Sequence, residues 1–305
     1  MRRYLLLMLL LASPALAWAK SGTALYLCAH PDDCILFMNP NLYDDIAQDA
    51  QKVVMVYFTS GDAGLPFSQE APKISYPYVR ELAAIDATAW AADAGKRPIS
   101  GDERTETVTI HGHDIDRVSY GNTASYFLRL PDGNMQGDGF ELYGHESLHK
   151  LKTGEIDSIT PIDGASAYKN WDDLVQVISG IIAQETTDEK KVTLHIQEPD
   201  TAKNTNDHSD HTTGANSVME ALTQRLTANA DQCYLLYKHI DYAIAEKPAN
   251  LDGAALQDKS GNFAVLTATQ RHSLDHHDWE EGHLAYIARN YYTTATLPNG
   301  CDKPQ

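Results

Sequence analysis

The sequence predicts an α/β fold built on a mainly parallel sheet. Short apolar runs typical of fully buried strands recur along the chain, and segments with helical spacing lie between them. Strands that alternate with helices indicate parallel strands joined by helical crossovers. Hydrophobic residues make up 43% of the 305 residues and charged residues 22%, which excludes a disordered chain, a coiled coil and a collagen-like fibre.

The predicted strands are short and uncharged, and the predicted helices are alanine-rich or amphipathic. The strands are Thr23–Ala29, Val53–Phe58, Val192–Ile196 and Cys233–Tyr237. The helices are Pro77–Asp93, Asn170–Gln184, Thr213–Leu226 and Trp279–Arg289. The second of these helices presents Leu174, Val177, Ile178 and Ile181 on one face, as a helix that packs on a sheet requires.

The middle of the chain has a different pattern. Three strand-like pieces, Thr105–Ile110, Arg117–Tyr120 and Ser125–Leu130, precede the glycine-rich segment Pro131–Phe140. We interpret this part as an inserted loop and hairpin region over one edge of the sheet. Because the sequence contains no internal repeat, linker or low-complexity segment, we expect residues 20–305 to form a single domain.

Residues 1–19 have the pattern of a secretory signal peptide. Two arginines precede a leucine-rich run that is too short to span a bilayer, and small residues at the end resemble a cleavage site. A buried N-terminal helix is the alternative. The leader predicts a secreted or periplasmic protein, and such a compartment permits disulfides. The four cysteines, Cys28, Cys34, Cys233 and Cys301, allow three complete pairings, and Cys28 lies in an apolar run where a buried thiol is expected.

The charge of the chain bounds its partners. The formal net charge is −18 at pH 7, which argues against nucleic acid and against an anionic lipid surface. After the leader, no stretch is long and apolar enough for a membrane helix, so we expect no membrane span in the mature chain. The sequence does not define an oligomeric state.

A histidine and two aspartates directly follow the first predicted strand. They are His30, Asp32 and Asp33 in the segment AHPDD. Ligands of open α/β sheets bind beyond the carboxyl ends of the strands. Imidazole and carboxylate together suit zinc, and a metal would offset the cost of burying the two carboxylates. The segment therefore predicts a metal site, with an Asx turn or a helix cap as the alternative.

A second group of histidines and acids follows the third predicted strand and precedes a helix. It includes His208 and His211, which are three residues apart and can face the same point. A catalytic zinc usually has three protein ligands and an open position, so His30, Asp33 and one of these two histidines would complete the set. A spare carboxylate beside the ligands could accept a proton from a water activated by the metal. A surface location for the histidine pair is the alternative.

Three motifs in this order, AHPDD, FTSGDAG (Phe58–Gly64) and HSDHTTG (His208–Gly214), resemble the PIG-L/LmbE-type zinc N-deacetylase family. The segment YVREL (Tyr78–Leu82) is similar to that of secreted members. The resemblance implies a Rossmann-like three-layer α/β/α fold. It also implies hydrolysis of an N-acetyl group on an amino sugar or glycoconjugate with one zinc ion per chain, although the same ligands could take iron, cobalt or nickel.

The resemblance implies a role for each matching residue. His30, Asp33 and His211 would bind zinc. Asp32 would be the general base that takes a proton from the attacking water. His208 would stabilise the oxyanion or protonate the leaving amine.

The resemblance also implies supporting residues. Asp210 would orient one of the two histidines of its motif, and Arg80 would contact substrate hydroxyls. Asp62, in FTSGDAG, is a candidate for a hydrogen bond to a metal ligand or a sugar hydroxyl, with a purely structural turn as the alternative.

Cys34 departs from the family pattern, which often has an acidic residue after the two aspartates. A further histidine group at His272–His283 is interpreted as a solvated helix start, with a second metal site or a lid as alternatives.

Two other functions remain open at this point. One is a metal-containing protein of the same fold that binds glycans without turning them over. The other is a zinc hydrolase that acts on another amide or on an ester. The presence of both Asp32 and His208 favours catalysis, because a protein that only binds glycans needs neither.

Overall fold

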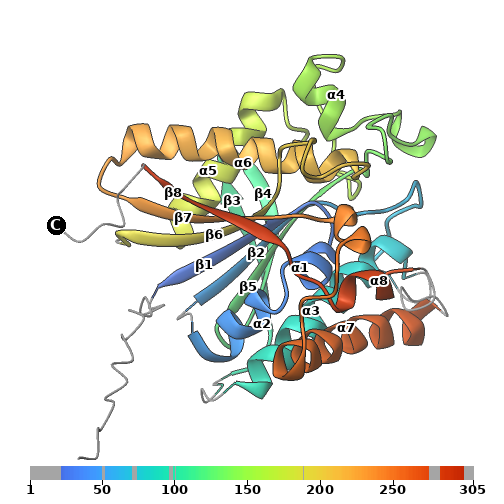
Figure 1. Cartoon of the computed structure of the whole chain (residues 1–305). Helices are drawn as coiled ribbons and strands as arrows, with labels where there is room; N and C mark the ends of the chain where they lie inside the picture. The colour runs from blue at the N-terminus through green and yellow to red at the C-terminus, as the bar shows by residue number, and fades with distance from the viewer. Residues whose placement is uncertain are drawn as a thin grey trace, which may run out of the picture.

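A computed structural model describes residues 22–49, 52–70, 74–95, 99, 101–187, 189–274 and 282–298. The predicted leader and Cys301 lie outside these residues. The named strands of the described part belong to one sheet, and helices cover both of its faces (Figure 1). The predicted three-layer α/β/α fold with a mainly parallel sheet is confirmed.

The sheet has eight strands in the order β3-β4-β5-β2-β1-β6-β7-β8. The central strands from β5 to β7 are parallel, whereas β3, β4 and β8 pair antiparallel at the two edges. The strands are β1 (Thr23–Cys28), β2 (Lys52–Thr59), β3 (Arg104–Ile110), β4 (His113–Tyr120), β5 (Thr123–Leu130), β6 (Lys191–Gln197), β7 (Cys233–His239) and β8 (Tyr292–Leu297).

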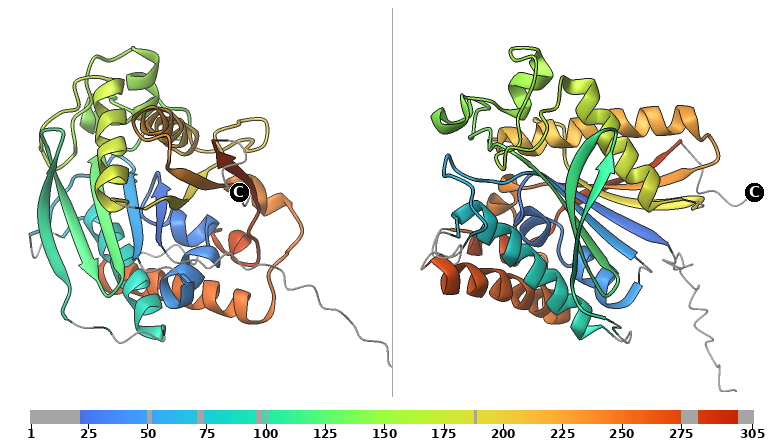
Figure 2. Two further views of the ribbon diagram at one scale, coloured as in Figure 1. Left: turned by 90° about the vertical axis from the view of Figure 1, so that its left-hand side faces the viewer. Right: turned by 180° about the vertical axis from the view of Figure 1, so that it is seen from behind.

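Two helical layers enclose the sheet, as Figures 1 and 2 show from three directions. One face carries α1 (Asp33–Phe37), α2 (Asn41–Asp44), α3 (Tyr76–Ala94), α7 (Gly253–Leu274) and α8 (Leu284–Ile287). The other face carries α4 (Leu148–Thr153), α5 (Trp171–Glu185) and α6 (Ser209–Ala228). Short turns of other helix types are Asp45–Asp49, Glu141–Tyr143 and Tyr242–Glu246. Within the described residues, none of the helices combines the length and the apolar character needed to cross a membrane.

The alternation of side chains along the central strands supplies both cores. In β1, Tyr26 and Cys28 pack in the core on the α3 and α7 side, whereas Leu25 and Leu27 pack in the core on the α5 and α6 side. Burial on both faces explains why the central strands are continuous apolar runs in the sequence. Because these strands are parallel, the loops that follow them meet at one edge of the sheet.

Several expectations about the elements need correction. The piece at Ser125–Leu130 is not part of an insertion, because β5 is a fully buried strand that pairs in parallel with β2. The helix α7 and the edge strand β8 were not predicted, and of the expected helix at Trp279–Arg289 the described residues include only α8. The first two misses have different reasons. The apolar residues of α7 do not gather on one face of the helix, and β8 is an edge strand that is largely exposed.

The cysteines also differ from expectation. Cys28 is not a free thiol, because it forms a disulfide with Cys34. Cys233 is disulfide-bonded as well. The prediction of one domain for residues 20–305 stays a prediction.

Candidate metal centre

Three side chains from two segments converge at the carboxyl edge of the sheet. His30 lies in the turn after β1, Asp33 is the first residue of α1, and His211 lies in the first turn of α6. His30 Nδ1 lies 3.3 Å from His211 Nε2 and 3.4 Å from Asp33 Oδ2. His211 Nε2 lies 3.3 Å from Asp33 Oδ1. The structure thus brings together the three residues that the resemblance assigns to the metal, and all three are buried.

Each of the two histidines has a carboxylate behind it. Asp207 Oδ1 lies 2.9 Å from His211 Nδ1, and Asp210 Oδ2 lies 3.4 Å from His30 Nε2. Because an ionised carboxylate only accepts hydrogen bonds, the one proton that each imidazole would keep on binding a metal is assigned to the nitrogen that faces away from the centre. The lone pairs of His30 Nδ1 and His211 Nε2 then point toward Asp33. A metal ion requires this orientation of its imidazole ligands.

The carboxylates perturb the titration of both imidazoles. Burial alone would lower the pKa of His30, but the charge of Asp33 and the hydrogen bond to Asp210 outweigh burial and raise the pKa to about 10. Burial is likewise outweighed at His211, where Asp207 and Asp33 raise the pKa well above its usual value. Burial would raise the pKa of Asp33, yet the two imidazoles hold it well below its usual range. The centre therefore attracts positive charge strongly.

The donor set fits a zinc ion. Bonds of about 2.0–2.1 Å in a tetrahedral site place neighbouring ligand atoms about 3.3–3.4 Å apart. His30 Nδ1 and His211 Nε2 are 3.3 Å apart, and they lie 3.4 Å from Asp33 Oδ2 and 3.3 Å from Asp33 Oδ1, respectively. Two imidazoles and one carboxylate also leave a coordination position open, as in catalytic zinc sites. These residues could therefore hold the metal with little rearrangement.

Comparison with known proteins agrees with this geometry. The family model PIG-L, described as GlcNAc-PI de-N-acetylase, matches residues 25–222, which include the turn after β1 and the first turn of α6. The chain belongs to the PIG-L family. PIG-L proteins are zinc-dependent in general and act on N-acetylated sugars, which suggests a metal-dependent de-N-acetylase here. No curated protein matches the chain.

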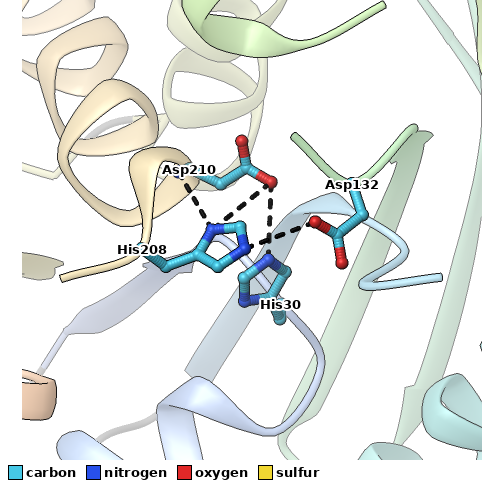
Figure 3. Close-up of side chains that lie close together, drawn as sticks. All are labelled: His30, Asp132, His208 and Asp210. Carbon is cyan, nitrogen blue, oxygen red and sulfur yellow. Dashed lines mark hydrogen bonds and ion pairs between the residues drawn. The ribbon is translucent and has the colours of Figure 1, made fainter. Parts of the chain in front are cut away.

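A second cluster lies on the other side of His30 and contains His208, Asp132 and Asp210 (Figure 3). The Nδ1 of His208 accepts a hydrogen bond of 3.2 Å from the backbone N–H of Asp210, so the proton of the neutral imidazole is on Nε2. This Nε2 faces Asp132 Oδ1 at 3.3 Å. His208 is therefore arranged as a hydrogen-bond donor rather than as a ligand of the centre.

The same contact explains where α6 begins. Because the ring of His208 caps the helix, α6 begins at Ser209, four residues before the predicted start. The first turn then carries His211 into the centre. The carboxylate of Asp210 lies 3.8 Å from His208 Nδ1, within its own motif, and 3.4 Å from His30 Nε2. His211 is backed by Asp207. The predicted role of Asp210 stays a prediction.

The loop after β5 holds Asp210 in place. The backbone N–H of Gly133 donates a hydrogen bond of 2.9 Å to Asp210 Oδ2, and a Cβ atom added at Gly133 would clash with the other carboxylate oxygen. The adjacent Asp132 accepts a hydrogen bond of 2.7 Å from Asn134 N–H. A hydrogen-bonded contact with His208 holds the pKa of Asp132 well below its usual range, against the effect of burial. This loop was not expected to belong to the site.

Asp32 and Arg80 form a buried ion pair. The guanidinium of Arg80 donates to Asp32 Oδ1 and, at 2.5 Å, to the carbonyl oxygen of Gly61. The predicted base is thus held by the residue that was expected to contact substrate hydroxyls. Glu81, the next residue of the YVREL segment, makes a two-pronged ion pair with Arg129 at 2.8 Å, which fixes α3 to the end of β5.

Asp62 has a structural position. It is fully buried, and its two carboxylate oxygens accept hydrogen bonds from the backbone N–H groups of Gly64 at 2.8 Å and Asp132 at 2.7 Å. Burial raises the pKa of Asp62 to about 6. The structural alternative weighed for Asp62 is the one that the geometry favours, because both oxygens are used within the fold.

Sequence analysis missed several residues behind His211. The side chain of Asn204 donates to Asp207 at 2.7 Å and to Asp241 at 2.8 Å, and Asp241 Oδ2 lies 3.7 Å from His211 Nδ1. Burial, and then the charge of Asp207, raise the pKa of Asp241 well above its usual value. Asp132 and Asp241 both follow strands of the parallel sheet, which is a signal that could have found them. In the further histidine group, His272 is exposed and residues 275–281 lie outside the described residues.

Proposed function

We propose that this chain is a zinc-dependent hydrolase that removes the N-acetyl group from an amino sugar or glycoconjugate. The observation that carries the proposal is the convergence of His30, Asp33 and His211. The two imidazole nitrogens lie 3.3 Å apart, and each lies 3.3–3.4 Å from one of the two carboxylate oxygens of Asp33, close to the edge length of about 3.3–3.4 Å of a tetrahedral zinc site. Membership of the PIG-L family supports the choice of an N-acetylated sugar as substrate. The leader motif supports export, so we propose a secreted or periplasmic location.

The residues around the centre divide the proton transfers between them. His30, Asp33 and His211 would hold a zinc ion, which would supply Lewis acidity toward the amide carbonyl and lower the pKa of water. Asp32 accepts a proton from the attacking water, and Arg80 orients that carboxylate. The Nε2–H of His208 donates a hydrogen bond to the carbonyl oxygen as negative charge develops there. The proton on Asp32 then passes to the leaving nitrogen, so that acetate and a free amine result.

The carboxylates behind the ligand imidazoles and the pair formed by Asp132 and His208 have different roles. Asp210 and Asp207 act as positioning residues, because each holds one ligand imidazole with its lone pair toward the centre. The carboxylate of Asp132 faces the Nε2–H of His208. When a substrate binds, this carboxylate either moves away from Nε2–H or shares its hydrogen bond with the substrate oxygen. We therefore propose that the cleft for the N-acetyl group lies between Asp32 and His208.

A two-step experiment tests this proposal. Native mass spectrometry compares zinc bound by the wild type with zinc bound by Asp33→Ala, and Asp157→Asn serves as an exposed acidic control. We expect one zinc ion per wild-type and control chain and none in Asp33→Ala. An empty wild type that also refuses added zinc would rule out the metal centre.

Acetate release from N-acetylglucosamine-containing substrates tests the chemistry. We expect release by the zinc-loaded wild type and a loss of about 100-fold or more in Asp32→Asn, because general-base catalysis contributes about 10²–10⁴-fold. Unchanged release by Asp32→Asn would exclude Asp32 as the base. Zinc binding without any acetate release would favour the glycan-binding alternative. Release from other amides or esters alone would favour a different hydrolase.

A further inference from the structure

Two cysteines enclose the segment that supplies the metal ligands and the base. Cys28 is the last residue of β1, Cys34 is the second residue of α1, and the two form a disulfide. His30, Asp32 and Asp33 lie between them in the chain. Both cysteines are fully buried, so the bond is shielded from reagents in the solvent once the protein has folded.

The helix that follows the turn is too short to be stable without support. It has five residues, Asp33–Phe37, and its N-cap residue Asp32 makes no side-chain capping hydrogen bond. The ligand Asp33 is the first residue of this helix, so its position depends on how firmly the helix start is held. The Asp33 carboxylate accepts hydrogen bonds from His30 N–H at 2.7 Å and from Gln197 Nε2 at 3.1 Å. These hydrogen bonds hold the carboxylate of Asp33 directly, whereas the disulfide joins the start of α1 to the end of β1.

We propose that the Cys28–Cys34 disulfide positions the metal ligands, so that the oxidation state of this pair controls the affinity of the centre for zinc. The inference rests on the proposed metal centre and adds a dependence on oxidation. Without the bond, the turn samples more conformations before the metal binds, and binding must then order it. Losses of supporting contacts around metal ligands typically weaken binding by about 10- to 100-fold, and we expect an effect of this size.

The disulfide forms by thiol–disulfide exchange before folding buries the two cysteines. Oxidation of the two thiols releases two protons and two electrons, and a disulfide oxidant such as glutathione disulfide accepts the electrons and becomes two thiols. In an oxidising compartment the disulfide would form and the site would bind zinc tightly. In a reducing compartment, where the chain is before export, the two thiols would stay unpaired and the site would bind zinc more weakly. This agrees with the predicted leader.

The chain offers a matched control for the test. Cys233 is also disulfide-bonded, and it lies at the start of β7, at the end of the sheet opposite the metal centre. Zinc affinity is measured by competition with a chromophoric chelator, with zinc alone as the ligand and with folding checked by circular dichroism. The proteins compared are the oxidised wild type, Cys28→Ala/Cys34→Ala, and Cys233→Ser/Cys301→Ser.

We expect the Cys28→Ala/Cys34→Ala protein to bind zinc about 10- to 100-fold more weakly than the wild type, and the Cys233→Ser/Cys301→Ser protein to bind it equally well. If the first variant fails to fold, the second decides, because Cys28 and Cys34 are its only cysteines. It is unfolded, reduced with a phosphine, desalted without oxygen, refolded and titrated, and then reoxidised with glutathione disulfide. We expect weak binding when it is reduced and full recovery after oxidation.

Two outcomes would contradict the inference in different ways. Equal or tighter zinc binding by the reduced protein, or by Cys28→Ala/Cys34→Ala, would overturn the role of the disulfide and leave the metal centre intact. The absence of zinc binding by the oxidised wild type would overturn the metal centre itself.

Discussion

The hydrogen bond between Asp207 and His211 should control zinc affinity. Replacing Asp207 with Asn keeps the shape of the side chain but removes the charge that holds the proton on His211 Nδ1, 2.9 Å away. A hydrogen bond to a charged group contributes about 1.5–3 kcal/mol. Since each factor of ten in affinity corresponds to about 1.4 kcal/mol, Asp207→Asn should weaken zinc binding by about 10- to 100-fold.

The assay is a competition titration with zinc and a chromophoric chelator at fixed pH and salt. Asp200→Asn is the matched control, because Asp200 lies in the same loop but is 48% exposed and pairs only weakly with Lys203, at 3.7 Å. Exposed ion pairs contribute about 0–1 kcal/mol, so the control should bind zinc like the wild type. Equal zinc affinity of folded Asp207→Asn and wild type would refute the argument that a carboxylate behind His211 prepares it as a ligand.

Three further predictions concern protons and packing. Zinc binding at pH 7 should release about two protons, measured by calorimetry in buffers of different ionisation enthalpy, because the raised pKa values of His30 and His211 keep both protonated without metal. Gly133→Ala should lower the unfolding free energy by about 1–3 kcal/mol and weaken zinc binding, since its Cβ would displace Asp210; unchanged urea unfolding and affinity would contradict this. Burial and then His195 hold the pKa of His239 well below 6.5, so the folded state binds fewer protons than the unfolded chain. Stability should therefore fall below about pH 6.5 by up to about 1.4 kcal/mol per pH unit, and urea titrations of His239→Asn should show a flatter pH dependence.

The sequence predicts the core of this fold well because the signals there are local. Strands such as β1 and β2 are buried on both faces, and short uncharged apolar runs of this kind are typical of fully buried strands. The strand β5 was misinterpreted because it follows a hairpin whose outer strand β3 is exposed and whose strand β4 is only partly buried, so that the whole region resembles an insertion. The pairing of β5 with β2 is a contact between distant segments, which no local pattern reveals.

The candidate site divides in the same way. The ligands His30, Asp33 and His211 could be predicted because they stand in compact motifs next to predicted strands. The residues behind them could not, because Asp207 and Asp210 differ only in which imidazole each one faces. That choice depends on the helical turn of α6. The position of this helical turn is set by the His208 ring, which caps α6, and the spacing of residues in the sequence does not predict that contact.

The charges at the centre explain how one folded structure can serve with and without metal. The carboxylates of Asp33, Asp207 and Asp210 surround two imidazoles, and their combined field raises the pKa of both rings. At neutral pH the two imidazolium groups supply two positive charges to these carboxylates. A divalent ion that replaces the two protons supplies the same charge at nearly the same place, so the exchange requires no compensating change elsewhere in the fold. It follows that acid should displace the metal before it disrupts the arrangement of the ligands. Two protons on the imidazoles then supply the positive charge that the departing metal no longer gives to the carboxylates.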